Sequence, residues 1–230
     1  MSAAPPLALP DPPSPDSAFA DVLEQAAAGG RKAERTRAAI RAAVCRLLDD
    51  GPPEHLKVAD ICRAAGIAHG TFYIYFKDIH AVIGTVLADF VPFVQAVMRA
   101  AGRSGGSAGL DRVRPATAAY VALFARNVGL MRCLTAGLEG FPEAREAFQR
   151  LNREWAQTVA EAARRDAAAA GRALPDRDEL LRRAYALGGM VDQYLVALHV
   201  HRDPTLAALS GDDDTVINTL TLIWKRGMTP

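Results

Sequence analysis

Residues 66 to 77 constrain the fold of this chain most, because they join a helix-breaking turn to a short aromatic helix. The segment reads Gly66-Ile67-Ala68-His69-Gly70-Thr71-Phe72-Tyr73-Ile74-Tyr75-Phe76-Lys77. Gly66 can adopt the positive φ that a sharp turn between two helices needs. Phe72 and Phe76 stand one helical turn apart, so they share one face. The opposite face offers short polar groups and phenolic hydroxyls, and it is free to contact another molecule.

Two further helices are predicted before this turn. An apolar stripe at helical spacing is formed by Val58, Ile61, Cys62 and Ala65. A second stripe is formed by Ile40, Val44, Leu47 and Leu48, in a stretch that ends at the stop signal Asp50-Gly51-Pro52-Pro53. Three helices with a small shared core, and a tight glycine turn before the last of them, predict a helix-turn-helix domain.

Residues 31 to 83 resemble the DNA-binding domain of the tetracycline-repressor (TetR/AcrR) family of bacterial transcription regulators. The resemblance rests on the string Val58-Ala59-Asp60-Ile61-Cys62-Arg63-Ala64-Ala65-Gly66-Ile67, followed by Gly70-Thr71-Phe72-Tyr73-x-Tyr75-Phe76-Lys77. By resemblance, the last helix would enter the major groove of DNA. The implied contacts are base edges for His69, Gly70 and Thr71, a thymine methyl for Ile74, and phosphates for Tyr73, Tyr75 and Lys77.

Positive charge gathers in the same segment. The net charge of the whole chain is only +1, which alone argues against a general nucleic-acid binder. Residues 31 to 77 nevertheless hold nine basic residues, Lys57 among them, and five acidic ones. The cluster Arg31-Lys32-x-x-Arg35-x-Arg37 has two open interpretations. In the first, these residues form a solvated helix start. In the second, Arg35 and Arg37 contact phosphates or the minor groove, because members of the family often contact DNA at this place.

Two positions depart from the family's pattern. Ala68 stands where the family usually has a small hydroxyl residue, so the reading helix lacks a side-chain N-cap, at a typical cost of about 1 kcal/mol. A backbone or water cap must substitute. Ile79 stands where the family usually has a lysine that contacts phosphate, so this contact is lost or moved to His80. We therefore expect weaker non-specific affinity for DNA, or a site contacted differently.

The first 30 residues are expected to form a disordered, proline-rich arm. Residues 2 to 16 hold six of the 14 prolines, a composition that does not favour a packed core. The start lacks a secretory signal, and no uninterrupted apolar stretch is long enough to span a bilayer. A cytoplasmic protein without membrane contact is predicted. Cys45, Cys62 and Cys133 show no paired spacing and are interpreted as small buried residues, with redox sensing by Cys62 or Cys133 as the alternative.

The remaining chain predicts more helix and no strand, so the fold class is all-α. A three-helix helix-turn-helix domain at residues 31 to 83 is followed by a larger helical domain, residues 84 to 230, for ligand sensing and dimerisation. Helices are expected at 79 to 101, 112 to 127, 129 to 138, 142 to 170, 177 to 201 and 212 to 226. The breaks between them contain glycine or proline.

The last two of these helices are amphipathic and predict a dimer interface. Their apolar stripes have more surface than one subunit needs, and the family dimerises through a four-helix bundle at this place. The expected interface residues are Leu187, Gly188, Val191, Leu195, Leu220, Ile223 and Trp224. A homodimer would bring two reading helices to successive major grooves, about 34–36 Å apart, on a palindromic operator.

A small-molecule site is expected between the DNA-binding end and the dimer helices. The candidate lining residues are Phe90, Phe93, Tyr120, Phe124, Met131, Trp155 and Tyr194, with Arg132, Glu139, Asp192 and Gln193 as polar anchors. The alternative for each aromatic residue is an ordinary place in the core. An apolar or amphipathic effector is the default expectation.

No catalytic or metal motif is present in the sequence, and no cofactor and no enzymatic activity are predicted. His199 and His201 are two residues apart on a helix, so they point to different sides and make a poor metal pair. The predicted function is a dimeric transcriptional repressor that a small ligand releases from its operator. The alternative is a regulator that depends on a corepressor or a protein partner and has no small-molecule inducer.

Overall fold

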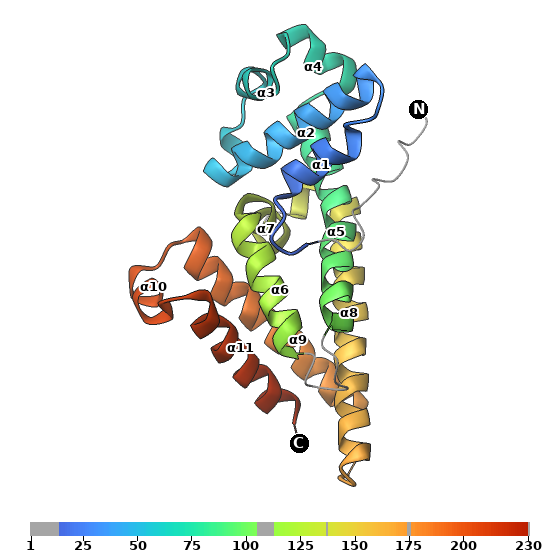
Figure 1. Cartoon of the computed structure of the whole chain (residues 1–230), viewed down its shortest axis with the longest axis vertical. Coiled ribbons are helices and arrows are strands. Elements are labelled where there is room, and N and C mark those ends of the chain that lie inside the picture. Colours follow the sequence, from blue (N-terminus) through green and yellow to red (C-terminus); the bar gives the residue numbers. More distant parts are fainter. Residues whose placement is uncertain (1–13, 105–112, 137, 174–175, 230) are drawn as a thin grey trace. The chain divides into compact units, whose positions relative to one another are not determined.

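The computed structural model describes residues 14 to 104, 113 to 136, 138 to 173 and 176 to 229 (Figure 1). Every regular element within these ranges is a helix, which confirms the all-α prediction. The chain divides into two compact units. Unit 1 comprises residues up to 96 together with 126 to 147, and unit 2 comprises the rest. This division differs from the predicted boundary at residue 83, because a later segment of chain returns to unit 1.

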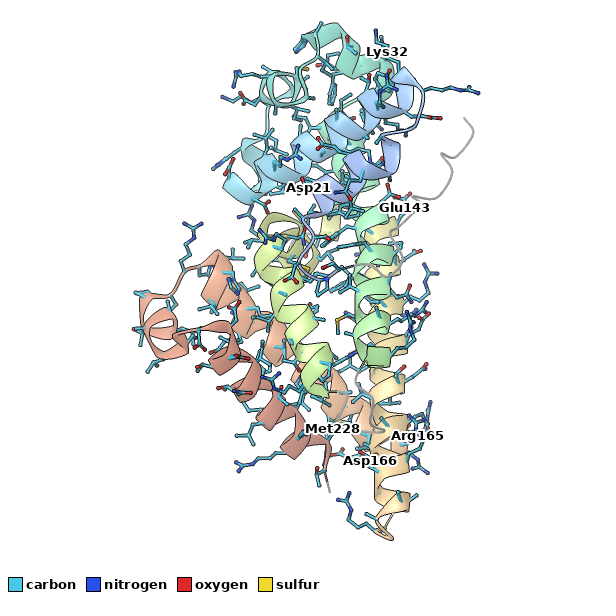
Figure 2. All side chains as sticks on the ribbon, in the orientation of Figure 1. Asp21, Lys32, Glu143, Arg165, Asp166 and Met228 are labelled. Atoms are coloured by element: carbon cyan, nitrogen blue, oxygen red, sulfur yellow. The ribbon has the colours of Figure 1, made fainter. Side chains whose placement is uncertain are left out.

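Unit 1 contains the N-terminal helices and one helix from the middle of the chain. Its elements are α1 (Phe19–Ala27), α2 (Lys32–Asp50), the 3-10 turn η1 (Pro53–His55), α3 (Val58–Ala65), α4 (His69–Tyr75), the greater part of α5 (Ile79–Ser104), α7 (Val128–Ala136) and η3 (Leu138–Gly140). Figure 2 marks Asp21 in α1 and Lys32 at the start of α2. The predicted succession of helix, helix, glycine turn and reading helix therefore corresponds to α2, α3 and α4.

Unit 2 contains the helices that follow α5, apart from α7. Its elements are α6 (Val113–Arg126), α8 (Pro142–Ala169) from residue 148, α9 (Arg177–Leu195), the π-helical segment η4 (Val196–Val200), α10 (Pro204–Ser210) and α11 (Asp213–Met228). All predicted helices have counterparts within a few residues. Helix α10 was not predicted, and the helix predicted at 177 to 201 changes to a π-helix at Val196.

The expectation of a disordered arm is wrong for residues 19 to 27, which form α1. Phe19 is fully buried, and its ring lies 5.2 Å from the ring of Phe90 and 5.3 Å from that of Phe93, centroid to centroid. The buried Asn127 side chain accepts a hydrogen bond from the Phe19 amide (2.7 Å) and donates one to the Ser17 carbonyl (3.2 Å). Apolar packing and this amide therefore order α1. Residues 1 to 13 of the predicted arm lie outside the described residues.

Helix α7 is joined to the end of α2 by backbone contact and two polar side chains. The Gly129 amide donates to an Asp49 carboxylate oxygen at 2.7 Å. The Arg132 guanidinium donates to the carbonyls of Leu48 and Gly51, each at 2.5 Å. These carbonyls lie at the C-terminus of α2, where a helix leaves its last acceptors without intrahelical partners. Arg132 therefore satisfies the end of α2, while its buried Nε has no hydrogen-bond partner among the described residues.

The core of unit 2 contains the inner faces of α9 and α11. The indole rings of Trp155 and Trp224 meet edge to face, with centroids 4.8 Å apart. Gly227 lies against the Leu187 side chain, and a Cβ at this glycine would come within 2.8 Å of it. Leu180, Leu195 and Leu220 have no exposed surface. The apolar stripes of these two helices are thus used within one subunit.

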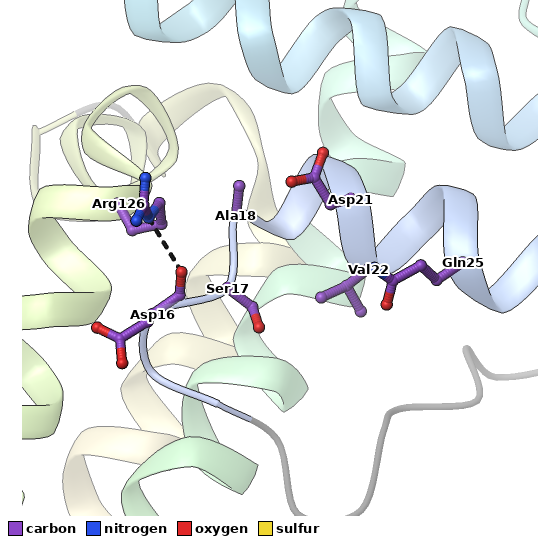
Figure 3. A pocket seen from close by; sticks show the side chains of 7 residues that line it. All are labelled: Asp16, Ser17, Ala18, Asp21, Val22, Gln25 and Arg126. Carbon is purple, nitrogen blue, oxygen red and sulfur yellow. Dashed lines mark hydrogen bonds between the residues drawn. The ribbon is translucent and has the colours of Figure 1, made fainter.

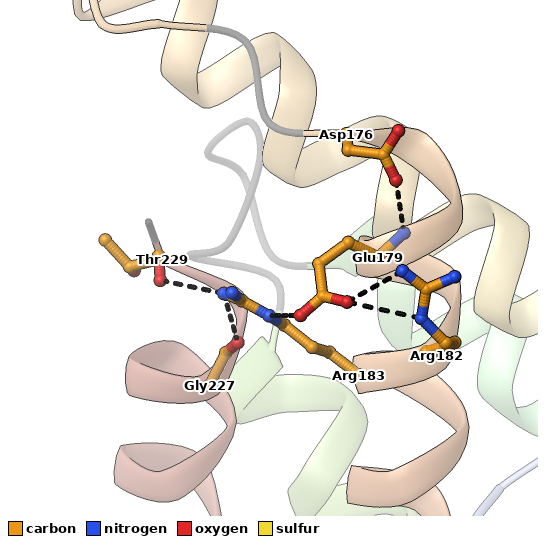
Figure 4. Close-up of polar contacts among 6 residues, drawn as sticks. All are labelled: Asp176, Glu179, Arg182, Arg183, Gly227 and Thr229. Atoms are coloured by element: carbon orange, nitrogen blue, oxygen red, sulfur yellow. Dashed lines mark hydrogen bonds and ion pairs between the residues drawn. The ribbon is translucent and has the colours of Figure 1, made fainter.

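A polar network ties the start of α9 to the end of α11 (Figure 4). The Asp176 carboxylate caps α9 by accepting from the Glu179 amide at 2.7 Å. The Glu179 carboxylate accepts hydrogen bonds from Arg183 and Arg182. Both hydrogen bonds lower the pKa of Glu179, and the one from Arg183 has the largest effect. Arg183 also donates to the Gly227 and Thr229 carbonyls at 3.4 Å. The long side chain of Arg183 thereby links the two helices.

Candidate functional site

The turn between α3 and α4 has the geometry that the sequence predicts. Gly66 adopts φ 64° and ψ 36°, the left-handed conformation that glycine tolerates best. Its amide and that of Ile67 donate back to carbonyls in the last turn of α3, including Cys62 at 3.0 Å from Ile67. Ile61 and Cys62 are buried on the inner face of α3. Local hydrogen bonds and core packing therefore fix the angle at which α4 leaves the turn.

One face of α4 is bound to the core of unit 1. Phe72 is fully buried and Phe76 is 4% exposed. The guanidinium of Arg37 lies over the Phe76 ring at 5.4 Å from its centroid, and its Nε is buried without a hydrogen-bond partner among the described residues. Arg37, predicted to contact DNA, is therefore partly withdrawn against an aromatic ring.

The other face of α4 is open. Tyr73 is 52% exposed and Ile74 78% exposed, while His69 and Gly70 are exposed as well. The rings of His69 and Tyr73 meet edge to face at 5.4 Å. Thr71 and Tyr75 are half-buried. Tyr73 and Ile74 thus leave neighbouring apolar surface on this face, which is available for contact with another molecule.

The basic side chains beside this face differ in whether they already have a partner within the protein. Lys57 is exposed immediately before α3, and the Lys77 side chain, 81% exposed, follows α4. Asp78 lies 3.9 Å from the Lys77 amine, a long and solvated ion pair. Arg35 is exposed but donates to the Gly30 carbonyl at 2.5 Å. Lys57 and Lys77 are thus free to reach an anion, whereas Arg35 would first have to leave a backbone partner.

Both departures from the family pattern have local consequences. No side chain caps α4 at Ala68, and the Ala68 carbonyl instead accepts from the Thr71 amide at 2.9 Å, which agrees with the expected backbone substitute. Near Ile79, the Asp78 carboxylate caps α5 through the Ala81 amide at 2.7 Å. The His80 ring stacks on Phe141 with centroids 4.3 Å apart, and its Nε2 lies 2.7 Å from the Gly140 carbonyl. The His80 ring therefore has partners within unit 1, and a contact with phosphate would have to displace its Nε2 from the Gly140 carbonyl.

The predicted dimer residues mostly face the inside of unit 2. Leu195 and Leu220 are fully buried, and Trp224 and Val191 nearly so. Gly188 faces the Trp155 ring, and Leu187 packs on Gly227. Ile223 alone of the predicted set is well exposed, at 38%. Leu187 and Gly188 are half-buried. The buried members of the predicted set therefore belong to the core of unit 2, and the dimer interface stays a prediction.

Continuous exposed stripes lie elsewhere on the same two helices. On α9 the exposed residues at helical spacing are Arg182, Tyr185, Ala186, Gly189 and Gln193. On α11 they are Thr215, Asn218, Thr219, Leu222, Ile223 and Arg226. The large apolar members, Tyr185 (48% exposed), Leu222 (50%) and Ile223, have no partner that would cover them among the described residues. Each helix therefore has one face for the core and a second, partly apolar face open to solvent.

The predicted effector residues fall into separate groups. Phe90, Phe93 and Met131 are fully buried in the core of unit 1, which is the alternative that the sequence analysis left open. Trp155 packs on Trp224 in unit 2, and the Tyr194 hydroxyl lies 3.0 Å from Ser210 Oγ. The polar candidates Glu139 and Gln193 are exposed.

The structure does bring three predicted effector residues together in unit 2. The Tyr120 hydroxyl of α6 donates to the Asp192 carboxylate of α9 at 2.6 Å, and the Tyr120 and Phe124 rings are 6.4 Å apart. Burial raises the pKa of Asp192 to about 6, against a smaller lowering by the Tyr120 hydrogen bond. Burial also raises the pKa of Tyr120, so this hydroxyl keeps its proton. Tyr120 and Asp192 thus form a hydrogen-bonded, ionisable pair next to the Phe124 ring.

His199 joins the same cluster, and the sequence analysis did not assign it there. Its ring lies 5.8 Å from that of Phe124, centroid to centroid. Burial lowers its pKa, so the ring is neutral at pH 7. Its Nε2 is buried and has no hydrogen-bond partner among the described residues. The i to i+7 spacing of Asp192 and His199 was the signal available in the sequence.

A different, polar pocket lies at the start of α1 (Figure 3). It has a volume of about 260 Å³ and is lined by Asp16, Ser17, Ala18, Asp21, Val22, Gln25 and Arg126. Arg126 donates to the Asp16 carbonyl at 3.0 Å. None of these residues was predicted to bind a ligand. The lining is unlike the apolar site that the sequence analysis expected.

The cysteines do not form a redox pair. Cys45, Cys62 and Cys133 are free and buried. Burial raises the pKa of the Cys45 thiol, and it raises that of Cys133 to about 11, which keeps both thiols protonated and slow to react. Within the described ranges, no three metal-binding side chains converge.

Comparisons with known proteins agree with this geometry. The family described as "Bacterial regulatory proteins, tetR family" matches residues 40 to 84, which run from α2 through α4 into α5. The HTH-type transcriptional regulator EthR of Mycolicibacterium smegmatis is 27% identical over 193 residues, 83% of this chain and 85% of the relative. EthR of Mycobacterium tuberculosis H37Rv is 29% identical over 191 residues, 81% of this chain and 83% of the relative.

Solved structures share the fold. A TetR-family transcriptional regulator from Bordetella parapertussis has a TM-score of 0.61 at 19% identity and covers 82% of this chain and 93% of its own. The regulator FadR from Bacillus subtilis, solved in complex with stearoyl-CoA, has a TM-score of 0.59 at 15% identity and covers 82% and 97%. The chain is therefore a helix-turn-helix regulator of transcription. Residues 40 to 84 match the TetR family model, and the longer alignments show that the chain is similar to regulators of that family.

Proposed function

We propose that this protein is a homodimeric repressor that reads a palindromic operator with α4. The observation that carries the proposal is the open face of α4, where Ile74 is 78% exposed beside Gly70 and Tyr73 on a helix whose other face is buried. A short helix fixed in this way fits the major groove, with base edges read by its first residues. Lys57 and Lys77 are placed to neutralise flanking phosphates.

We infer that a small molecule bound in unit 2 lowers the affinity for the operator. FadR from Bacillus subtilis was solved with stearoyl-CoA, which supports a small-molecule effector for a protein of this fold. A ligand can shift the equilibrium only if it binds the DNA-incompetent state more tightly. Adding cell extract to the operator complex distinguishes the mechanisms. An inducer releases the DNA, a corepressor tightens binding, and an unchanged complex points to a protein partner.

We infer a cytoplasmic location, as expected for a regulator that contacts DNA. No apolar stretch long enough to span a bilayer was predicted, but helix α5 from Ile79 to Arg103 does reach that length and composition. Half of its most apolar window is buried inside the structure. Phe90 and Phe93 account for part of this burial by packing on α1. The apolar character of α5 is thus explained by its place in the core.

Replacing Gly70 with alanine is expected to weaken DNA binding without destabilising the fold. A Cβ at Gly70 meets no atom within 4 Å, and alanine favours helix over glycine, so the free protein should be stabilised by up to about 1 kcal/mol. A methyl group on the open face would push the reading helix away from the bases. Specific affinity for the operator should fall about 10-fold or more, on the scale of one lost base contact.

The measurement is a gel shift with the upstream DNA of the protein's own gene at two salt concentrations, beside thermal unfolding. Gly102→Ala is the matched control, because it is also a helical glycine with open space around it but lies at the end of α5. Wild-type affinity and selectivity in Gly70→Ala would contradict the proposed approach of α4 to the bases.

A second expected result concerns the dimer. We propose that the exposed stripes of α9 and α11 pair with the same stripes of a second copy, with Ala186 and Gly189 permitting close approach of helices. Gly189 has open space where a Cβ would be. Leu222→Arg should then convert dimer to monomer and weaken operator binding, because it places a charge in an apolar interface.

Analytical ultracentrifugation checks this result. Leu209→Arg is the control, because Leu209 is even more exposed, at 74%, but belongs to α10. Both variants change one exposed leucine to the same charge. A Leu222→Arg protein that sediments as the wild type does, or a Leu209→Arg protein that alone dissociates, would refute this interface.

A further inference from the structure

Helix α6 meets α9 and η4 through two aligned contacts in unit 2. Tyr120 and Phe124 are one helical turn apart on α6, and Asp192 and His199 are two turns apart on the facing segment. Tyr120 pairs with Asp192 at 2.6 Å, and Phe124 pairs with His199 at 5.8 Å between ring centroids. Four neighbouring side chains thus combine aromatic faces with one carboxylate and one imidazole.

The carboxylate of Asp192 has no cationic partner. No ion pair involves it among the described residues, and the only polar group that affects its pKa is the Tyr120 hydroxyl. Asp192 as a whole residue is half-buried. Burying a carboxylate without a positive charge is unfavourable, and the cost persists until a cation is supplied. The fold therefore maintains a largely buried carboxylate whose charge is not balanced by a cation among the described residues.

The imidazole of His199 adds an unused polar atom on the same side. η4 is a π-helix, a rare element that often occurs at functional sites. His199 is neutral there, and in the tautomer with its proton on Nδ1, the buried Nε2 offers a lone pair. A ligand at this place would meet the Asp192 carboxylate beside the Tyr120 hydroxyl, and the His199 ring beside that of Phe124.

We propose that the effector of this regulator is an amphiphilic amine whose protonated nitrogen pairs with Asp192. The aromatic rings of Tyr120 and Phe124 would hold the cation and the adjoining apolar group. A neutral ligand could form only a hydrogen bond with Asp192, and an anionic one would be repelled by it. The proposal rests on the proposed small-molecule control and makes it specific by naming the charge of the ligand.

A matched series of three probes tests the charge directly. 4-Phenylbutylamine, 4-phenylbutanol and 4-phenylbutyrate share the same aromatic body and differ in one terminal group. Their binding to the full-length protein is measured by isothermal titration calorimetry at pH 7.5, without DNA. The amine should bind at least about 10-fold more tightly than the alcohol, and the acid should bind most weakly.

Two substitutions assign the preference to one residue. Asp192→Asn should reduce the amine's advantage over the alcohol to less than about 2-fold, because shape is kept and charge is removed. Asp214→Asn makes the same chemical change at a carboxylate whose side chain is 77% exposed, and it should keep the preference. Circular dichroism of each variant confirms that the fold is intact.

The test of the amine site and the test of small-molecule control of DNA binding can fail independently. Amine preference that depends on Asp192 supports the proposal even if the amine fails to release operator DNA in a gel shift, because the inducer mechanism is tested separately by the cell-extract experiment. Equal binding of amine and alcohol, tighter binding of the acid, an unchanged preference in Asp192→Asn, or no binding of the amine overturns the proposal.

Discussion

Phe19→Ala is expected to lower the free energy of unfolding by about 3–5 kcal/mol, the usual cost of deleting a fully buried aromatic side chain. Phe19 has no exposed surface and contacts the rings of Phe90 and Phe93. The substitution would leave a cavity between α1 and α5 and would weaken the attachment of α1 to unit 1. Urea unfolding followed by circular dichroism measures the loss.

Gln25→Ala is the control in the same helix. Gln25 is exposed, so its removal should change stability by no more than about 0.5 kcal/mol. A loss below about 1 kcal/mol for Phe19→Ala would mean that α1 is not docked in solution. Residues 19 to 27 would then behave as part of a disordered arm, as the sequence analysis expected.

The second large effect is expected at Gly129. A Cβ on this residue would lie 2.2 Å from the carbonyl carbon of Leu48, 2.3 Å from its oxygen and 2.5 Å from the Asp49 nitrogen. All three are backbone atoms, so α7 and α2 would have to separate. Gly129→Ala should cost about 3 kcal/mol or more, and it should also weaken the hydrogen bonds that Gly129 and Arg132 make to the end of α2.

Thermal and urea unfolding again provide the measurement. Gly102→Ala is the reference, since it is a glycine in a helix with no atom within 4 Å of a new Cβ. That variant should be neutral or slightly more stable, because alanine favours helix. If Gly129→Ala unfolded at the wild-type midpoint, the close approach of α2 and α7 would be absent in solution.

The DNA-binding segment was predictable because its signals are local. A glycine at a turn, apolar residues at helical spacing and a stop at residues 50 to 53 predict α2, α3 and α4 without knowledge of the rest of the chain. Positive φ at Gly66 and burial of Phe72 and Phe76 confirm these elements. The residues assigned to bases and phosphates stay predictions, since their contacts depend on DNA.

Two helix starts beside prolines were missed. The chain does break at Asp203-Pro204, as predicted for a break that contains proline, but the Asp203 carboxylate also caps α10 through the Leu206 amide and Pro204 occupies the first helical turn. The prolines before residue 16 likewise obscured the apolar repeat of Phe19, Val22 and Leu23, which is the buried face of α1. In both cases a proline stands at or before the start of a helix and does not prevent it.

Other features depend on which partner a side chain meets and were beyond sequence reasoning. Helix α11 has an apolar stripe, but only packing decides that Leu220 and Trp224 face the core while Leu222 remains exposed. Arg37 and Arg132 have the same charge in the sequence. In the structure the first lies over a phenylalanine ring and the second satisfies helix carbonyls. Charge alone does not reveal such assignments.

The return of α7 to unit 1 has a consequence for how the chain is synthesised. When translation has reached residue 96, the segments that form α1 to α4 exist, but Asn127, Gly129 and Arg132 do not. Asp49, the carbonyls at the end of α2 and the amide of Phe19 then await partners encoded 80 to 108 residues later. Unit 1 is therefore built from two separate stretches of chain, and we expect it to complete these contacts only after α7 has been synthesised.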